Sequence, residues 1–199
     1  MDMTPLILSL KAAAVATVLV ILTGIPVSYL AARMKRGKSI VDVICTLPMV
    51  LPPTVVGFFL LLLFGKNSML GAWLMAHGIP VVFSQTGMVI ASAVVSFPLL
   101  YRTARGAFEQ VNPDVLSAGR TLGMSEWSIF FRVMIPNALP GIISGGVLAF
   151  ARGLGEFGAT AMIAGNIPGR TRTLPLAVYS EVAAGNMDAA YPVSYTHLR

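Results

Sequence analysis

Four long apolar runs constrain this chain more than any motif does. They cover residues 6–32, 40–64, 81–101 and 137–165. About 20 consecutive apolar residues suffice to cross a bilayer as a helix, in which every backbone polar group is bonded internally. Hydrophobic residues make up 56% of the chain, charged residues only 11%, and the mean hydropathy is +0.79. The sequence therefore predicts an all-α, polytopic helical membrane protein with a single transmembrane domain over 1–199.

Basic residues flank the apolar runs and indicate the orientation of the chain. Four of the six residues from 33 to 38 are Arg or Lys, and Arg102 and Arg105 follow the third run. Loops rich in Lys and Arg stay on the cytoplasmic side of a membrane. We therefore expect the N-terminus outside and the polar stretch 112–136 in the cytoplasm. Because these flanking positions explain the net charge of +6, no nucleic-acid partner is expected.

Prolines interrupt the second apolar run. Pro52 and Pro53 stand near its centre, in the sequence TLPMVLPPTVVG, which also contains Pro48. Proline lacks a backbone donor and clashes with the preceding helical turn, so this segment should be broken or kinked and surrounded by other helices. Two interpretations remain open. The break is either a kink required for packing or one wall of a translocation path.

The stretch 112–136 is the longest polar interruption and carries the signals of two short helices. Asn112 can cap a first helix that begins at Pro113, and Gly123 marks its end. Ser125 can cap a second helix, which we expect Pro136 to close. The spacing predicts two helices that meet at a glycine corner, in a place suited to a docking element.

The second of these helices has one strongly apolar face. Trp127, Phe130, Phe131 and Met134 recur at spacings of three and four, which places them on the same side of a helix. We expect these side chains to pack back against the helices of the same chain. The docking contact would then fall to the glycine corner and to the residues before it.

The fourth run combines small residues with two opposite charges. Gly141 and Gly145 have the spacing that lets two membrane helices approach closely. Arg152 and Glu156 lie one helical turn apart at membrane depth, where an unpaired charge is costly. They are either a mutually neutralising pair or part of a polar path. The match of GLGEFG to G-x-G-x-x-G does not indicate a dinucleotide site, because no strand precedes it.

The connecting segments show no signs of a reaction centre. Residues 65–85 are expected to form an external loop with an interfacial helix at about 69–76, and residues 166–187 an external segment. Cys45 is the only cysteine, and His77 has no other metal-ligating residue close in sequence. We therefore expect neither a metal site nor a catalytic residue.

The stretch SAGRTLG, followed by nine residues and then VMIP, resembles the cytoplasmic EAA loop of bacterial ABC importer permeases. That pattern is E-A-A, three residues, G, nine residues and I-x-L-P. Here Ser117 stands where the family often has Glu, and Gly119 replaces the second Ala. LPPTVVGF at 51–58, SFPLLYRTARGAFE at 96–109 and the stretch 138–179 are similar to the molybdate permease subunit. Sulfate and thiosulfate permeases share the GEFGA-like element and are the alternative within the same fold.

The resemblance implies a MetI-like bundle in the bacterial cytoplasmic (inner) membrane that pairs with a second copy as a homodimer. It also implies a dimer of ABC ATPase subunits, which hold ATP and Mg²⁺, and an external binding protein that delivers the oxyanion. No cofactor is expected on this chain. The residues expected to meet the ATPase are Ser117, Ala118, Gly119, Arg120, Gly123 and Pro136. The residues expected along the translocation path or its gate are Pro52, Pro53, Arg152, Glu156, Phe157 and Gly158.

Permeases of this kind have one more spanning helix after the external segment. The stretch GNMDAAYPVSYTHLR holds no apolar run of that length, so we expect the bundle to lack its last transmembrane helix and to end in an atypical tail at about 192–199. Two other classes of function remain as alternatives. A polytopic membrane enzyme would have only Arg152 and Glu156 for its chemistry, and a membrane scaffold would not transport at all.

Overall fold

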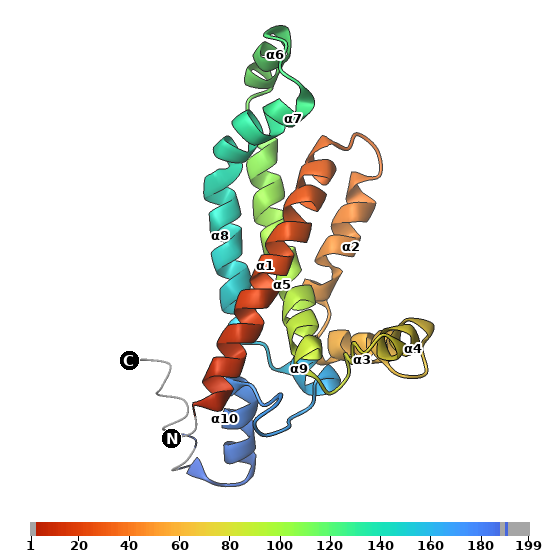
Figure 1. Cartoon of the computed structure of the whole chain (residues 1–199). Helices are drawn as coiled ribbons and strands as arrows, with labels where there is room; N and C mark the ends of the chain where they lie inside the picture. Colours follow the sequence, from red (N-terminus) through yellow and green to blue (C-terminus); the bar gives the residue numbers. More distant parts are fainter. Residues whose placement is uncertain (1–2, 188–189, 191–199) are drawn as a thin grey trace.

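The computed structural model describes residues 3–187 and 190, and in that part of the chain all regular elements are helical. Three long helices, α1 (Thr4–Arg33), α5 (Gln85–Glu109) and α8 (Ile135–Leu154), run side by side as a bundle (Figure 1). Each belongs to a helical segment long and apolar enough to cross a membrane. α5, which corresponds to the third apolar run, extends past the predicted end at residue 101, so Arg102 and Arg105 lie on its last two turns.

Glycines let the long helices approach closely. A Cβ at Gly24 of α1 would lie 2.7 Å from Leu100 Cδ2 of α5. On α8, a Cβ at Gly145 would collide with Thr103 Oγ1, and one at Gly141 would lie 2.5 Å from Ala107 Cβ. The close packing expected from the spacing of Gly141 and Gly145 is thus made within the chain, against α5.

The second apolar run is not one straight span. It divides into α2 (Lys38–Val50) and α3 (Pro53–Phe64), which meet at 110°. The break expected at Pro52 and Pro53 occurs there, because two successive residues without an N–H cannot continue the helical ladder. With 13 residues, α2 is about 20 Å long, shorter than a hydrocarbon core of about 30 Å.

α3 packs against a helix from the C-terminal part of the chain, next to the break between α2 and α3. A Cβ at Gly57 of α3 would lie 2.7 Å from Ala159 Cα of α9 (Gly158–Ile163), so the two backbones touch. Beyond α3 the chain forms α4 (Met69–Ala76), which matches the helix expected at about 69–76. Ser68 caps it by accepting a hydrogen bond from Gly71 N at 2.8 Å.

The fourth apolar run differs from the prediction at both ends. The helix begins earlier, because α7 (Glu126–Ile129) continues through a π-helical turn, η1 (Phe130–Met134), into α8. Pro136 therefore does not close a helix but lies in the first turn of α8. In η1 the Ile135 N–H bonds to Phe130 O, five residues back, and this wider turn accommodates a proline that has no donor. The helix ends at Leu154, and residues 155–157 separate it from α9.

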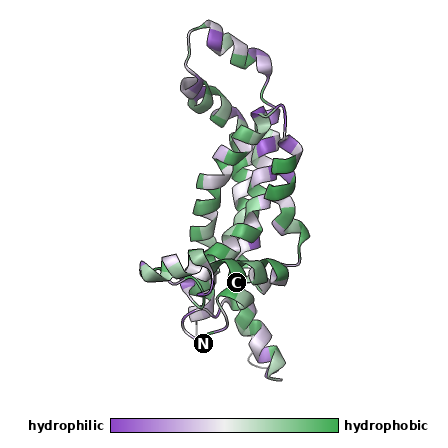
Figure 2. Cartoon of the chain, turned by 90° about the vertical axis from the view of Figure 1, so that its right-hand side faces the viewer, coloured by the Kyte–Doolittle hydropathy of each residue, from purple (hydrophilic) through white to green (hydrophobic). Residues whose placement is uncertain are grey.

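The two ends of the bundle differ in character. α6 (Pro113–Thr121) and α7 project from one end, while α3, α4, α9 and α10 (Leu174–Ala183) gather at the other (Figure 1). Hydrophobic residues cover the bundle, and many of the hydrophilic ones lie in the end with α6 and α7 (Figure 2). The segment 166–187, which was expected to lie outside, contains the helix α10. Leu174 N at the start of α10 donates to Ser9 Oγ of α1 at 2.8 Å. The tail at 192–199 lies outside the described residues.

Candidate functional site

The projecting loop 112–136 has the capped, two-helix geometry expected of it. Asn112 Oδ1 accepts from Asp114 N at 2.8 Å at the start of α6, and Ser125 Oγ accepts from Ser128 N at 3.2 Å at the start of α7. Gly123 forms the corner between them with a φ of 76°. This left-handed conformation favours glycine because it brings a side chain too close to the backbone. The local sequence thus specifies a rigid corner.

The residues before the corner present a mostly exposed surface. Ser117 and Ala118 are exposed, and Ser117 Oγ donates to Pro113 O one turn back. Gly119 is buried, and a Cβ there would lie 3.4 Å from Ile129 Cγ1, in ordinary contact with α7. Its role is to seat α6 on α7. Pro136 is exposed but begins α8 at the far end of η1, away from the corner in sequence.

Glu126 links this loop to the bundle. Its carboxylate accepts from Arg120 Nε of α6 at 2.7 Å and pairs with Arg33 Nη2 of α1 at 3.1 Å. The hydrogen bond to Glu126 raises the pKa of Arg120, so that guanidinium stays charged. Sequence reasoning missed this connection, because Arg33 and Glu126 are far apart in the chain and each is explained locally, as a flanking cation and a first-turn acid.

The aromatic face of the second short helix is divided. Phe130 packs on Tyr29 of α1 with ring centroids 4.6 Å apart, and Met134 is only 4% exposed, as expected. Trp127 and Phe131, in contrast, are 74% and 61% exposed and stack on each other rather than on the bundle. The expectation that all four side chains pack inward was therefore wrong for these two. They line an apolar cleft of about 650 Å³ beside α1.

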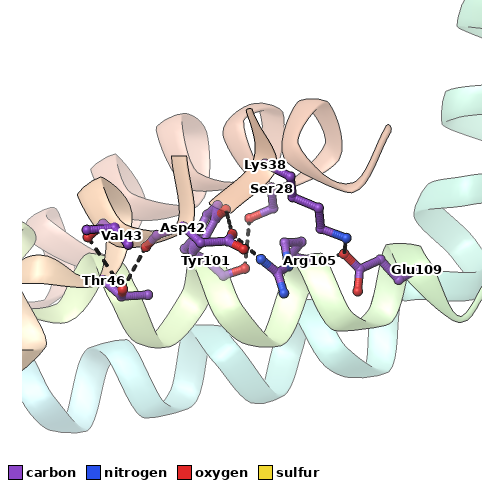
Figure 3. A network of polar contacts seen from close by, with 8 residues as sticks. All are labelled: Ser28, Lys38, Asp42, Val43, Thr46, Tyr101, Arg105 and Glu109. Atoms are coloured by element: carbon purple, nitrogen blue, oxygen red, sulfur yellow. Dashed lines mark hydrogen bonds and ion pairs between the residues drawn. The ribbon is translucent and has the colours of Figure 1, made fainter. Parts of the chain in front are cut away.

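A polar network joins α2 to α5 at the same end of the bundle (Figure 3). Asp42 Oδ1 accepts from the Tyr101 hydroxyl at 2.5 Å and pairs with the Arg105 guanidinium. Lys38 Nζ reaches Glu109 Oε1 at 2.6 Å. α2 has no buried residue, and these polar contacts link it to α5. An acid inside an apolar run is the signal that could have found Asp42 from the sequence.

The pair of charges in the fourth run forms as expected, but at a helix break. Arg152 Nη1 lies 2.7 Å from Glu156 Oε2, and Glu156 is 2% exposed. The other carboxylate oxygen of Glu156 accepts from Ala159 N at 2.7 Å, so this side chain also caps α9. One buried acid therefore neutralises a cation and organises the connection from α8 to α9.

The expected path residues gather around that connection. A Cβ at Gly158 would lie 3.0 Å from Pro53 Cβ, so the breaks of the second and fourth runs lie against each other. Pro52 accepts from Val55 N and Val56 N through its carbonyl and thereby starts α3. Phe157 turns away toward Tyr179 of α10, with ring centroids 5.1 Å apart. Sequence reasoning predicted the break at Pro52 and Pro53 but not the break of the fourth run at 155–157, and it did not indicate that the two breaks meet.

The described residues offer little for reaction chemistry. Within residues 3–187 and 190, no group of three His, Cys, Asp or Glu side chains is placed to hold a metal ion. What the arrangement provides instead is a set of helices broken at two places, one of them held by an ion pair and a side-chain cap, and a projecting polar loop. These are features of a polytopic membrane transport subunit with a surface for a protein partner.

The comparisons with known proteins agree with that class. The chain belongs to the family of binding-protein-dependent transport system inner membrane components, whose family model matches residues 24–191. It is 47% identical to the molybdenum transport system permease protein ModB of Escherichia coli (strain K12), over 87% of this chain and 77% of that protein. It is 43% identical to ModB of Mycobacterium tuberculosis, over 96% of this chain and 72% of that protein. ModB of Haemophilus influenzae is 42% identical over 90% of this chain and 80% of its own length.

Proposed function

We propose that this chain is the permease subunit of a bacterial ABC importer that moves molybdate or tungstate into the cell. The observation that carries the proposal is its 47% identity, over most of its length, to a permease named for molybdenum transport. Several further relatives carry the same name, which favours this substrate over the sulfate or thiosulfate of the alternative. Molybdate and tungstate have nearly the same size and charge, so one path would serve both.

The partner that supplies energy would dock on the loop 112–136. α6 and the corner at Gly123 project beyond the bundle, and Ser117, Ala118 and Arg120 face outward there. A dimer of ATPase subunits that hold ATP and Mg²⁺ would bind these residues on two copies of the permease. The Glu126 link to Arg33 would then carry movement of the loop to α1. An external binding protein would deliver the oxyanion at the end that carries α4 and α10, where α1 begins.

The gate would lie where the two broken runs meet. Pro52 and Pro53 start α3 across a 110° bend, and Gly158 starts α9 against them. Arg152 and Glu156 hold the second break through their ion pair. Short helices that meet at breaks can reorient without unwinding the long helices, and this property suits a path that opens alternately to the two sides.

A matched pair of glycine variants tests the docking surface. Gly123 and Gly78 both have a φ near +75°, and a Cβ at either would meet no atom within 4 Å. Gly123→Leu and Gly78→Leu therefore introduce the same backbone strain, but at opposite ends of the molecule. We expect Gly123→Leu to abolish copurification of the ATPase and Gly78→Leu to leave it intact. Equal retention of the ATPase by both variants would contradict docking at this corner.

The substrate is tested by uptake into proteoliposomes that contain the permease, its ATPase and its binding protein. We expect ATP-dependent uptake of labelled molybdate that is inhibited by tungstate in equal concentration and resists the same concentration of sulfate. Uptake inhibited equally by sulfate would favour the sulfate or thiosulfate alternative. No ATP-dependent uptake of any of the three oxyanions would argue for a scaffold.

A further inference from the structure

A polar groove lies between α5 and α8 at the end of the bundle that carries α6. Its volume is about 690 Å³, and none of the residues that line it comes from α1 or α2. It is distinct from the helix breaks described above, which lie at the other end of both helices (Figure 1). Its polar lining comprises Arg102, Thr103 and Gln110 of the α5 segment, Asn112, and Asn137 and Ser144 of α8.

Small residues create the groove. Gly106 and Ala107 of α5 and Pro140 and Gly141 of α8 line it, and a Cβ at Gly141 would lie 2.5 Å from Ala107 Cβ. The absent side chains at Gly141 and at Gly145 further along are required by the close approach of α5 to α8 within this chain. Packing inside one copy therefore accounts for them, and they do not call for a helix from a second copy. The open volume of the groove lies between the longer polar side chains that line it.

One unpaired cation, Arg102, lines the groove. Arg105, Lys38, Arg33 and Arg120 are all paired with carboxylates. Arg102 is exposed, and in the described part of the chain it has neither an ion pair nor a hydrogen bond. No carboxylate is among the residues that line the groove, so its net charge is positive.

Two of the five other polar side chains of the groove are free donors, and Asn112 Oδ1 accepts from Asp114 N at 2.8 Å. The side chains of Gln110 and Ser144 form no hydrogen bonds with the described residues. Asn137 Nδ2 donates to Val133 O at 2.7 Å, and Thr103 Oγ1 donates to Leu99 O at 2.9 Å. A guanidinium, an amide NH₂ and a hydroxyl thus face a common space without partners. A tetrahedral oxyanion accepts hydrogen bonds on every oxygen, and a guanidinium can bind two of them at once.

We propose that this groove is a binding site for the transported tetrahedral oxyanion, occupied on the cytoplasmic side before release. The inference rests on the proposed function, since it assigns a second station to the same substrate. One guanidinium with two neutral donors makes a weak site, and weak sites allow an ion to leave. Arg102 pairs with the negative charge of the oxyanion, and Gln110 and Ser144 orient the ion by donating hydrogen bonds to it.

Thiol labelling tests the site in the permease–ATPase complex. Cys45 is the only cysteine, so Cys45→Ala followed by Ser144→Cys places a single thiol in the groove. Its reaction rates with an anionic and a cationic methanethiosulfonate reagent are then compared, with and without Arg102→Gln. Arg36→Gln is the matched control, because Arg36 is an exposed cation in the loop after α1, outside the groove.

We expect the anionic reagent to react faster than the cationic one, and its own rate to fall roughly fivefold in Arg102→Gln, the effect of one unit charge at about 4 Å in water. Arg36→Gln should leave the ratio unchanged. Millimolar molybdate should slow labelling in the parent more than chloride at equal ionic strength, and should lose that effect in Arg102→Gln. A ratio that does not depend on Arg102, or labelling that molybdate does not slow, overturns the proposal.

Two further outcomes are decisive. If Ser144→Cys resists both reagents and forms a disulfide with a second copy, the groove is a contact between permeases and the proposal fails. If the Cys45→Ala parent transports no molybdate with its ATPase and binding protein, the proposed function fails instead. The labelling ratio still reports the preference of the groove for anions, because it does not depend on transport.

Discussion

Replacing Glu156 should reveal how a single buried acid stabilises the fold. Its carboxylate makes two contacts of 2.7 Å, with Arg152 Nη1 and with Ala159 N, and the residue is 2% exposed. Glu156→Ala removes both. A hydrogen bond to a charged group contributes about 1.5–3 kcal/mol, and removing one partner of a buried ion pair costs about 3–5 kcal/mol. Because the Arg152 side chain is 33% exposed and the pair is only partly buried, we expect a total loss near the lower end, about 3 kcal/mol.

Two companion variants separate these contacts. Glu156→Gln keeps an oxygen that can accept from Ala159 N but removes the charge, so its cost should be about 1–2 kcal/mol. Arg152→Met leaves the buried carboxylate unpaired and should cost about as much as Glu156→Ala. In the double variant Glu156→Gln/Arg152→Met neither charge remains, so its loss should be smaller than the sum of the two single losses by at least about 1 kcal/mol.

Equilibrium unfolding of the purified permease in mixed micelles with increasing SDS, followed by far-UV circular dichroism, measures these losses. The reasoning would be refuted by strictly additive losses, because the two side chains would then not interact. It would also be refuted if Glu156→Ala unfolded at the same SDS fraction as the unmodified protein, because the carboxylate would then contribute nothing to the α8–α9 connection.

Three further changes have definite expected results. Tyr101→Phe removes one of the two contacts of Asp42 and should lower unfolding free energy by about 1 kcal/mol in the same titration, while an unchanged value would show that the hydroxyl is dispensable. Gly119→Ala should raise the free energy of unfolding by about 0.5–1 kcal/mol, because a methyl group fits beside Ile129 and alanine favours the helix. A lower unfolding midpoint would mean that α6 and α7 pack more tightly than the 3.4 Å contact indicates. Glu126→Gln should leave the unfolding midpoint unchanged, because the ion pairs of Glu126 are exposed. It should nevertheless speed amide hydrogen exchange in α6, because the loop loses its link to α1. Unaltered exchange would contradict that role of Glu126.

Features that depend on neighbouring residues could be predicted from the sequence. The capped helices of the loop 112–136 and the break at Pro52 and Pro53 were found because a cap or a proline acts on its own helical turn. Pro136 was misjudged for a related reason. A proline ends a regular helix, and the π-helical turn that accommodates it has no local signal in these residues.

Contacts between distant segments could not be predicted from one sequence. Nothing in the neighbourhood of Asp42 points to Tyr101, and nothing around Glu126 points to Arg33, because each pair is brought together only when the long helices pack. The same holds for Trp127. Its spacing placed it on an apolar face, but how α1 crosses that face decides which side chains are covered.

The sequence by itself therefore determined the class of protein, the number and rough extent of its apolar segments and the existence of a polar loop with two capped helices. These follow from hydropathy and from the backbone requirements of a membrane, which act on each segment independently. Only the tertiary structure decided that the two helix breaks meet at Pro53 and Gly158, and that Arg102 faces a groove while Arg105 is neutralised by Asp42. The two arginines lie less than one helical turn apart, so packing alone, not composition, separates their roles.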